Sequence, residues 1–273
     1  QCEYIVRFYK HLHVNKISYL VLELCEGIEL FEYISIKSEL SEYQSKKIIK
    51  MLSTAIQFLH NIHIVHRDIK PENIIVGEFS DVYILDWGLA QQNPEEDLFP
   101  ELEDNLLPPG RIIGTVAYMP PERALGEPAS LQGDVYALGV ILYQLLTYRH
   151  PFTRGKMKDF RENHHKEVLV PPEILMPHRE IPQQLSQICQ RCLAADPAVR
   201  YSNVDQLLDE LYSYMEGRSE WVQTSGICIH DADDWEFQEN ILLTRHLALH
   251  RIQEGVDWVN LMISKSYFSG NIK

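Results

Sequence analysis

The chain has 273 residues, 45% of them hydrophobic, and a formal net charge of −14. These values exclude a disordered chain and suit one large domain, or one domain with a piece of another. The negative charge argues against nucleic acid or an anionic membrane as the main partner, and a basic peptide would suit it better.

The sequence contains no run of about 18 apolar residues, so we expect no membrane span in this stretch. Its five cysteines are scattered, and Cys189 and Cys192 are the only close pair. Because no second pair completes a zinc site and both lie in a helical apolar pattern, we interpret them as buried thiols. Free thiols favour a reducing, cytoplasmic compartment.

Two short runs rich in β-branched and aromatic residues open the chain, at 6–9 and 16–24. Polar residues that include Asn15 separate them, so the pattern predicts a β-hairpin. A helix is predicted to begin at Ser41, because Ser41 and Gln44 form a capping box. Apolar residues at helical spacing give this helix a buried face, at Ile48, Leu52, Ala55, Ile56 and Leu59.

The helix leads to a polar stretch of the form H-R-D-x-K-x-x-N, which runs from His66 to Asn73. A carboxylate, an ammonium group and an amide fall here within six residues, at Asp68, Lys70 and Asn73. Together they can accept a hydroxyl proton, neutralise a moving phosphoryl group and hold a magnesium ion. A polar turn after a helix is the alternative, and five matching positions in fixed order argue against it.

A second hairpin is predicted after this loop, from residues 74–76 and 82–85. It would bring Asn73 and Asp86 to neighbouring strand ends, where both side-chain oxygens can reach one magnesium ion. Asp86 also begins the sequence Asp86-Trp87-Gly88, which has the form D-W-G. The pattern therefore predicts a metal site of hard oxygen ligands beside the polar loop.

A third motif, G-T-x-x-Y-x-P-P-E, runs from Gly114 to Glu122. With the two motifs before it, the chain resembles eukaryotic-type (Hanks-type) serine/threonine protein kinases of bacterial kind, from about Val6 to Met215. It departs from the family pattern at Trp87, where Phe is usual, and at Pro120, where Ala is usual. The resemblance implies an α+β protein kinase-like fold, mostly the helical C-terminal lobe with the last strands of the N-terminal lobe.

The resemblance also implies a function: transfer of the γ-phosphate of ATP to Ser or Thr hydroxyls of a protein, with Mg²⁺. Asp68, Lys70 and Thr115 would be catalytic, and Thr115 favours Ser/Thr over Tyr acceptors. Asn73 and Asp86 would hold the metal. The hinge at 23–25 would pair with adenine, and Leu22 would guard the rear of that pocket. The full set expected to bind the nucleotide is Leu22, Glu23, Cys25, Lys70, Asn73, Ile75 and Asp86.

The segment from Gln91 to Pro109 is acidic, and no Ser, Thr or Tyr lies between Trp87 and Gly114. An activation-loop phosphate, which would pair with Arg67, therefore has no acceptor there. One interpretation is a solvated acidic loop. The other is that a carboxylate replaces the phosphate opposite Arg67, the candidates being Glu95, Glu96, Asp97, Glu101, Glu103 and Asp104.

Three more helices are expected, at 135–146, 185–193 and 204–215, and the first is apolar on nearly all sides and therefore buried. Asp134 is suited to bind the amides at the start of that helix. The resemblance adds that Asp134 holds the backbone of the catalytic loop. It also implies a buried ion pair between Glu122 and Arg200.

We expect residues 1–216 to be a partial kinase domain, because no Gly-rich loop, strand Lys or helix Glu is visible. Residues 217–273 would be a C-terminal extension or the start of a second domain. The chain does not open on Met, so we expect an amino-terminally truncated kinase that is nearly inactive alone. A pseudokinase scaffold and a small-molecule phosphotransferase of related fold are the alternatives. Glu29 and Glu72 would receive substrate arginines, or are plain surface carboxylates.

Overall fold

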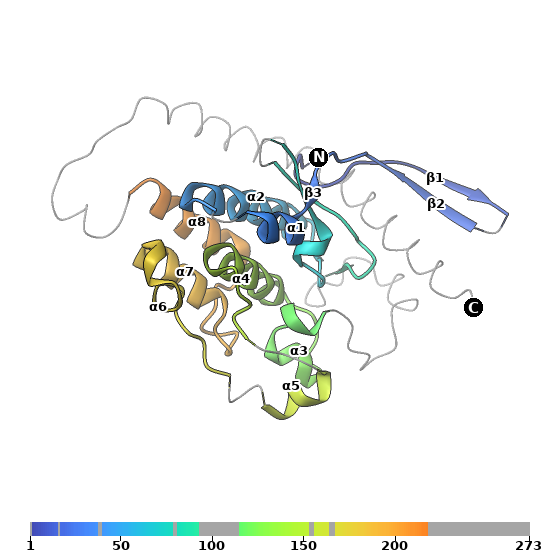
Figure 1. Ribbon diagram of the computed structural model, residues 1–273. Coiled ribbons are helices and arrows are strands. Elements are labelled where there is room, and N and C mark those ends of the chain that lie inside the picture. Colours follow the sequence, from blue (N-terminus) through green and yellow to red (C-terminus); the bar gives the residue numbers. More distant parts are fainter. Residues whose placement is uncertain are drawn as a thin grey trace.

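The computed structural model describes residues 2–15, 17–37, 40–78, 81–92, 115–152, 156–163 and 167–217. Figure 1 shows a helical body with small sheets along one side and a two-stranded arm that extends away from it. This combination of helices and short strands confirms the expected α+β class. The acidic residues 95–104 and the segment 218–273 lie outside the described residues, so the predictions made for them stay predictions.

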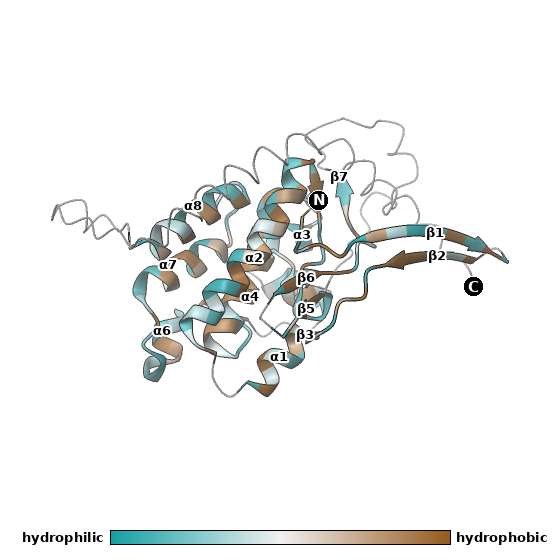
Figure 2. Ribbon diagram, turned by 90° about the horizontal axis from the view of Figure 1, so that it is seen from above, coloured by the Kyte–Doolittle hydropathy of each residue, from teal (hydrophilic) through white to brown (hydrophobic). Residues whose placement is uncertain are grey.

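The arm is the first predicted hairpin. Strand β1 (Phe8–Val14) pairs antiparallel with β2 (Ile17–Leu22), and Asn15 turns the chain with φ of 50°. The prediction ended the first strand at Tyr9, but the strand continues to Val14. Alternation of polar and apolar side chains over these residues is itself a strand pattern. Figures 1 and 2 both show that the arm extends away from the helices.

Two further sheets lie at the junction of the arm and the body. The first has the order β3 (Ile28–Glu29), β5 (Ile74–Val76), β6 (Val82–Ile84), and all its pairs are antiparallel. The second joins β4 (Ile64–Val65) to β7 (Gln91–Gln92). The β5–β6 pair confirms the second predicted hairpin. A 3-10 turn, η1 (Pro71–Asn73), leads directly into β5.

Gly27 allows the chain after the arm to pass closely over β5. Its φ is +153°, and a Cβ at this position would lie 2.3 Å from the carbonyl oxygen of Val76 and 2.8 Å from the Cγ2 of Ile75. No side chain fits in that space, so only glycine lets β3 reach its partner strand. The short helix α1 (Leu30–Ile36), which no sequence pattern predicted, follows at once.

Helix α2 (Glu42–Asn61) confirms the predicted capping box. The Ser41 hydroxyl accepts a hydrogen bond from the Gln44 amide at 3.1 Å, and the Gln44 side chain accepts one from the Ser41 amide at 3.0 Å. The helix therefore begins at Glu42 with Ser41 as its cap. Its predicted apolar face is buried, and it packs against the two longest C-terminal helices.

Those helices are α4 (Leu131–Thr147) and α8 (Val204–Met215), and α7 (Gln183–Cys192) packs against both of them. Figure 2 shows their apolar residues gathered where the helices meet. Gly139 brings α4 close to α7, because a Cβ there would lie 2.5 Å from the Cβ of Cys192. Cys189 and Cys192 are buried free thiols, as expected.

Helix α4 begins earlier than predicted, and this corrects the role given to Asp134. Ser130 is the cap, and its hydroxyl accepts a hydrogen bond from the Gly133 amide at 3.2 Å. Asp134 lies inside the first turn and does not bind the amides of the helix start. The predicted helix began at residue 135, whereas α4 begins at Leu131, one turn earlier, directly after Ser130.

The remaining described elements are short: the first three lie next to the segment that follows the acidic residues, and the last two lie beside α4 and α7. They are η3 (Val116–Tyr118), α3 (Pro121–Leu125), α5 (Met157–Asn163), α6 (Pro172–Leu175) and η5 (Pro177–Arg179). Among the described residues, no helix is both long and apolar enough to cross a membrane.

Candidate active site

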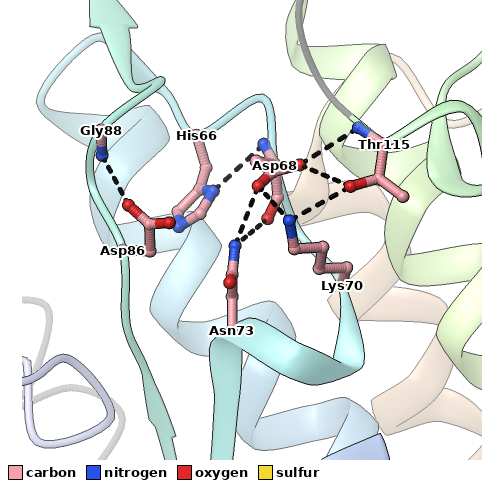
Figure 3. A network of polar contacts seen from close by, with 7 residues as sticks. All are labelled: His66, Asp68, Lys70, Asn73, Asp86, Gly88 and Thr115. Atoms are coloured by element: carbon pink, nitrogen blue, oxygen red, sulfur yellow. Dashed lines mark hydrogen bonds and ion pairs between the residues drawn. The ribbon is translucent and has the colours of Figure 1, made fainter. Parts of the chain in front are cut away.

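The polar loop between β4 and η1 brings three predicted catalytic residues into contact (Figure 3). The Lys70 ammonium nitrogen lies 2.7 Å from Oδ2 of Asp68 and 3.1 Å from the hydroxyl of Thr115. The Thr115 amide and hydroxyl each lie 3.3 Å from Oδ1 of Asp68. Only 7% of Asp68 is exposed, so these contacts hold its carboxylate in one orientation.

Asn73 completes the contacts of Asp68 from the opposite side. Its amide nitrogen donates to the Asp68 carbonyl at 2.9 Å and to Oδ2 at 3.0 Å. The Asn73 carbonyl accepts a hydrogen bond from the Leu85 amide at 2.8 Å, which sets Asn73 beside the residue that follows, Asp86. This is the adjacency expected from the second hairpin.

Asp86 is exposed and has φ of 55°, in the left-handed region. Its Oδ1 accepts a hydrogen bond from the Gly88 amide at 3.0 Å. Neither its Oδ2 nor the side-chain oxygen of Asn73 has a hydrogen-bond partner among the described residues. These two oxygens are hard donors, and together with phosphate and water they suit magnesium.

Trp87 packs under the loop in place of the phenylalanine usual at this position. It is 3% exposed, and its ring lies 5.2 Å from the ring of His66. Burial lowers the pKa of His66, so the imidazole is neutral and can accept the Asp68 amide at its Nδ1, 3.3 Å away. The larger indole ring therefore fits in the core and packs against His66, whose ring accepts the Asp68 amide.

Asp134 holds the loop from below, as the family resemblance implied. Its carboxylate accepts the amides of His66 at 2.8 Å and Arg67 at 3.0 Å. His60 of α2 lies 3.1 Å from the same carboxylate. Burial alone would raise the pKa of Asp134, but the hydrogen bond with His60 and the loop amide hold it below the usual value. Sequence reasoning missed His60, because its partner is far away in the chain.

The Arg67 side chain turns towards the start of the acidic segment. Its Nε donates to the Leu89 carbonyl, and its Nη1 donates to the side-chain oxygen of Gln91. One of the two interpretations of the acidic segment placed a carboxylate opposite Arg67, and those candidates lie outside the described residues. Gln91 was missed because an uncharged residue gives no electrostatic signal in a sequence.

A hollow opens on the Thr115 side of Asp68, away from Asn73. Residues of the catalytic loop and of the segment that begins at Thr115 line it together, among them Asp68, Thr115, Met119, Pro120 and Arg123. Burial lowers the pKa of Arg123, whose side chain donates to the Glu127 carbonyl. Asp68 therefore separates two regions, one with metal-type ligands and one with this hollow.

The ion pair implied for Glu122 and Arg200 is present and buried. The two guanidinium ends lie 2.6 Å and 2.7 Å from the two carboxylate oxygens, so the contact is bidentate. Nε of Arg200 also donates to the Ala194 carbonyl at 2.6 Å. The pair fastens α3, and with it the segment after Thr115, to the loop between α7 and α8.

The expected hinge follows β2. Leu22 is the last residue of that strand, and the Glu23 amide donates to the Arg7 carbonyl at 2.7 Å. Burial raises the pKa of the half-buried Cys25 thiol. Ile75, expected to contact the nucleotide, pairs with Glu29 in β5–β3 and faces away from the buried neighbours on its strand.

Comparison with known proteins gives consistent matches. The model of the protein kinase domain matches residues 1–213. Three relatives are named serine/threonine-protein kinase PknD.

The one from Protochlamydia amoebophila (strain UWE25) is 45% identical over 236 residues, which cover 83% of this chain and 24% of the relative. The one from Chlamydia abortus (strain DSM 27085 / S26/3) is 40% identical over 227 residues, covering 80% of this chain and 24% of the relative. The one from Chlamydia caviae (strain ATCC VR-813 / DSM 19441 / 03DC25 / GPIC) is 38% identical over 252 residues, covering 88% and 26%. The chain thus spans about a quarter of the length of these relatives.

Proposed function

We propose that this chain, which belongs to the protein kinase family, transfers the γ-phosphate of ATP to Ser or Thr hydroxyls of a protein substrate. The observation that carries this proposal is the Asp68 carboxylate held between Lys70 and Thr115. The names of the relatives agree with it. In this proposal residues 1–216 form the kinase domain, and residues 217–273 are an extension or a second domain.

Asp68 would act as the base. Its carboxylate is oriented by Lys70, Asn73 and Thr115, and the hollow beside it gives a substrate hydroxyl access. Accepting the hydroxyl proton as the oxygen attacks is worth about 10²–10⁴ in rate. The Thr115 hydroxyl borders the same hollow, so it would align a Ser or Thr side chain against the carboxylate.

Lys70 and the oxygen ligands would act on the phosphate side. The Lys70 ammonium group lies next to Asp68 and would neutralise the phosphoryl group as it moves. Asn73 and Asp86 would hold magnesium through the two oxygens that face away from other described side chains. When bound there, magnesium would supply positive charge that offsets the charge of the phosphates.

The hinge would bind the adenine edge. The Glu23 carbonyl and the Cys25 amide have no hydrogen-bond partner among the described residues, while the Glu23 amide is held by Arg7. Leu22 would guard the rear of that pocket, and Ile75 would add an apolar contact to the nucleotide. A cytoplasmic location, where ATP is available, fits the four described cysteines, all of which are free thiols.

A basic peptide is the substrate class that the surface supports best. Glu29 and Glu72 are exposed, and the elements that carry them, β3 and η1, contact each other. Two carboxylates beside the catalytic loop would attract an arginine or lysine of the substrate. A peptide array in which basic residues bring no preference would remove this part of the proposal.

The main test offers casein-like protein and small alcohols separately to the full-length protein, with labelled ATP and magnesium. We expect labelled Ser or Thr in the protein, lost in the Asp68→Asn variant. Label on the small alcohols alone would indicate a small-molecule phosphotransferase. Nucleotide binding with no transfer to either would indicate a pseudokinase scaffold.

A further inference from the structure

We propose that Gln91 is a positioning residue for the transfer reaction, which holds Arg67 by a neutral hydrogen bond where a phosphate would otherwise be needed. The inference rests on the proposed kinase function and adds a mode of activation to it. It predicts a catalytic loop that is ordered without phosphorylation of the acidic segment.

The first support is the geometry of Arg67. Its guanidinium group donates both to the Leu89 carbonyl and to the side-chain oxygen of Gln91. Its backbone amide is held by Asp134 at 3.0 Å, and its φ is +70°. A non-glycine residue keeps such a φ only where the surroundings enforce it. Arg67 is therefore fixed at both ends, directly before Asp68.

The second support is the way Gln91 itself is placed. It belongs to β7, and its partner in the antiparallel pair with β4 is Val65. Val65 is buried and directly precedes His66. The backbone of Gln91 is thus paired with the strand that enters the catalytic loop. This pairing places the side-chain oxygen of Gln91 within hydrogen-bond distance of Arg67.

The third support comes from the sequence. No hydroxyl-bearing residue lies between Trp87 and Gly114, so the segment offers no acceptor for an activating phosphate. The next hydroxyl, that of Thr115, already contacts Asp68 and Lys70. An amide oxygen accepts from a guanidinium group more weakly than a phosphate does, but it is always present. Phosphatases cannot remove it.

The experiment uses the full-length protein, dephosphorylated and checked by mass. We expect wild-type transfer activity to survive dephosphorylation. In Gln91→Ala, kcat should fall about tenfold, in line with the loss of one hydrogen bond to a charged group, while the KM for ATP stays unchanged. Gln91→Glu keeps the acceptor oxygen and should restore activity.

The matched control is Gln92→Ala, on the same strand. Successive side chains of a strand point to opposite faces, so we expect Gln92 to lie on the face opposite to Gln91. This variant should keep wild-type kcat. If it loses as much as Gln91→Ala, or if dephosphorylation silences the wild type, the positioning role is refuted.

A second measurement separates this inference from the proposed function. Amide hydrogen exchange at residues 64–67 should quicken in Gln91→Ala and stay slow in Gln91→Glu, with residues 135–146 of α4 unchanged in both. This readout needs no catalysis. If the protein transfers no phosphate yet shows this exchange pattern, the proposed function fails and the hold of Gln91 on Arg67 is supported by itself. Unchanged exchange at 64–67 overturns the positioning role whatever the activity.

Discussion

Removing one charge from the buried pair of Glu122 and Arg200 should destabilise the chain strongly. In Glu122→Gln, the carboxylate becomes neutral and Arg200 keeps its charge in a site where its side chain is fully buried. Stranding one member of a buried pair costs about 3–5 kcal/mol. The Glu122 side chain is 14% exposed, so some solvent reaches the site and we expect the lower end, about 3 kcal/mol.

Thermal unfolding of the 273-residue chain, followed by circular dichroism, measures this effect. For a domain of this size, about 3 kcal/mol corresponds to a fall in Tm of about 6–12 °C. The control is Glu210→Gln, which breaks a pair with Arg191 at 3.1 Å whose side chains are 37% and 47% exposed. Pairs this exposed contribute about 0–1 kcal/mol. If both variants lose the same few degrees, the buried pair does not fasten α3 as reasoned.

Three further predictions test other parts of the structure. Asp68→Asn should lower the kcat of the full-length protein by about 10²–10⁴, while calorimetric titration shows ATP binding retained; unchanged kcat would exclude Asp68 as the base. Gly139→Ala should reduce the free energy of unfolding in urea by about 1–3 kcal/mol, because the new Cβ would lie 2.5 Å from that of Cys192. The lowered pKa of Asp134 gives stability that is present above its unfolded pKa of about 3.9 and is lost as the pH falls through the lower folded value. Urea unfolding at a series of acidic pH values should therefore show a flatter decline for Asp134→Asn, and an equally steep one would contradict the linkage.

Local features could be predicted well from the sequence. The capping box at Ser41 involves residues three apart, and Asp68, Lys70 and Asn73 lie on one short loop, so neighbours in the chain are also neighbours in space. The second hairpin follows for the same reason. The start of α4 is the exception, because Asp134 and Ser130 are both good caps and only packing chose between them.

The sequence by itself therefore determined the family and the α+β class, and it placed the proposed site residues, because each depends on short motifs. The tertiary structure alone decided which distant residues hold those motifs in place. His60 reaches Asp134 across 74 positions, and Gln91 reaches Arg67 across 24. The glycines at 27 and 139 show their purpose only where another element passes within van der Waals distance. Such contacts depend on how the elements pack, and no periodicity or spacing along a single chain encodes which pair will meet.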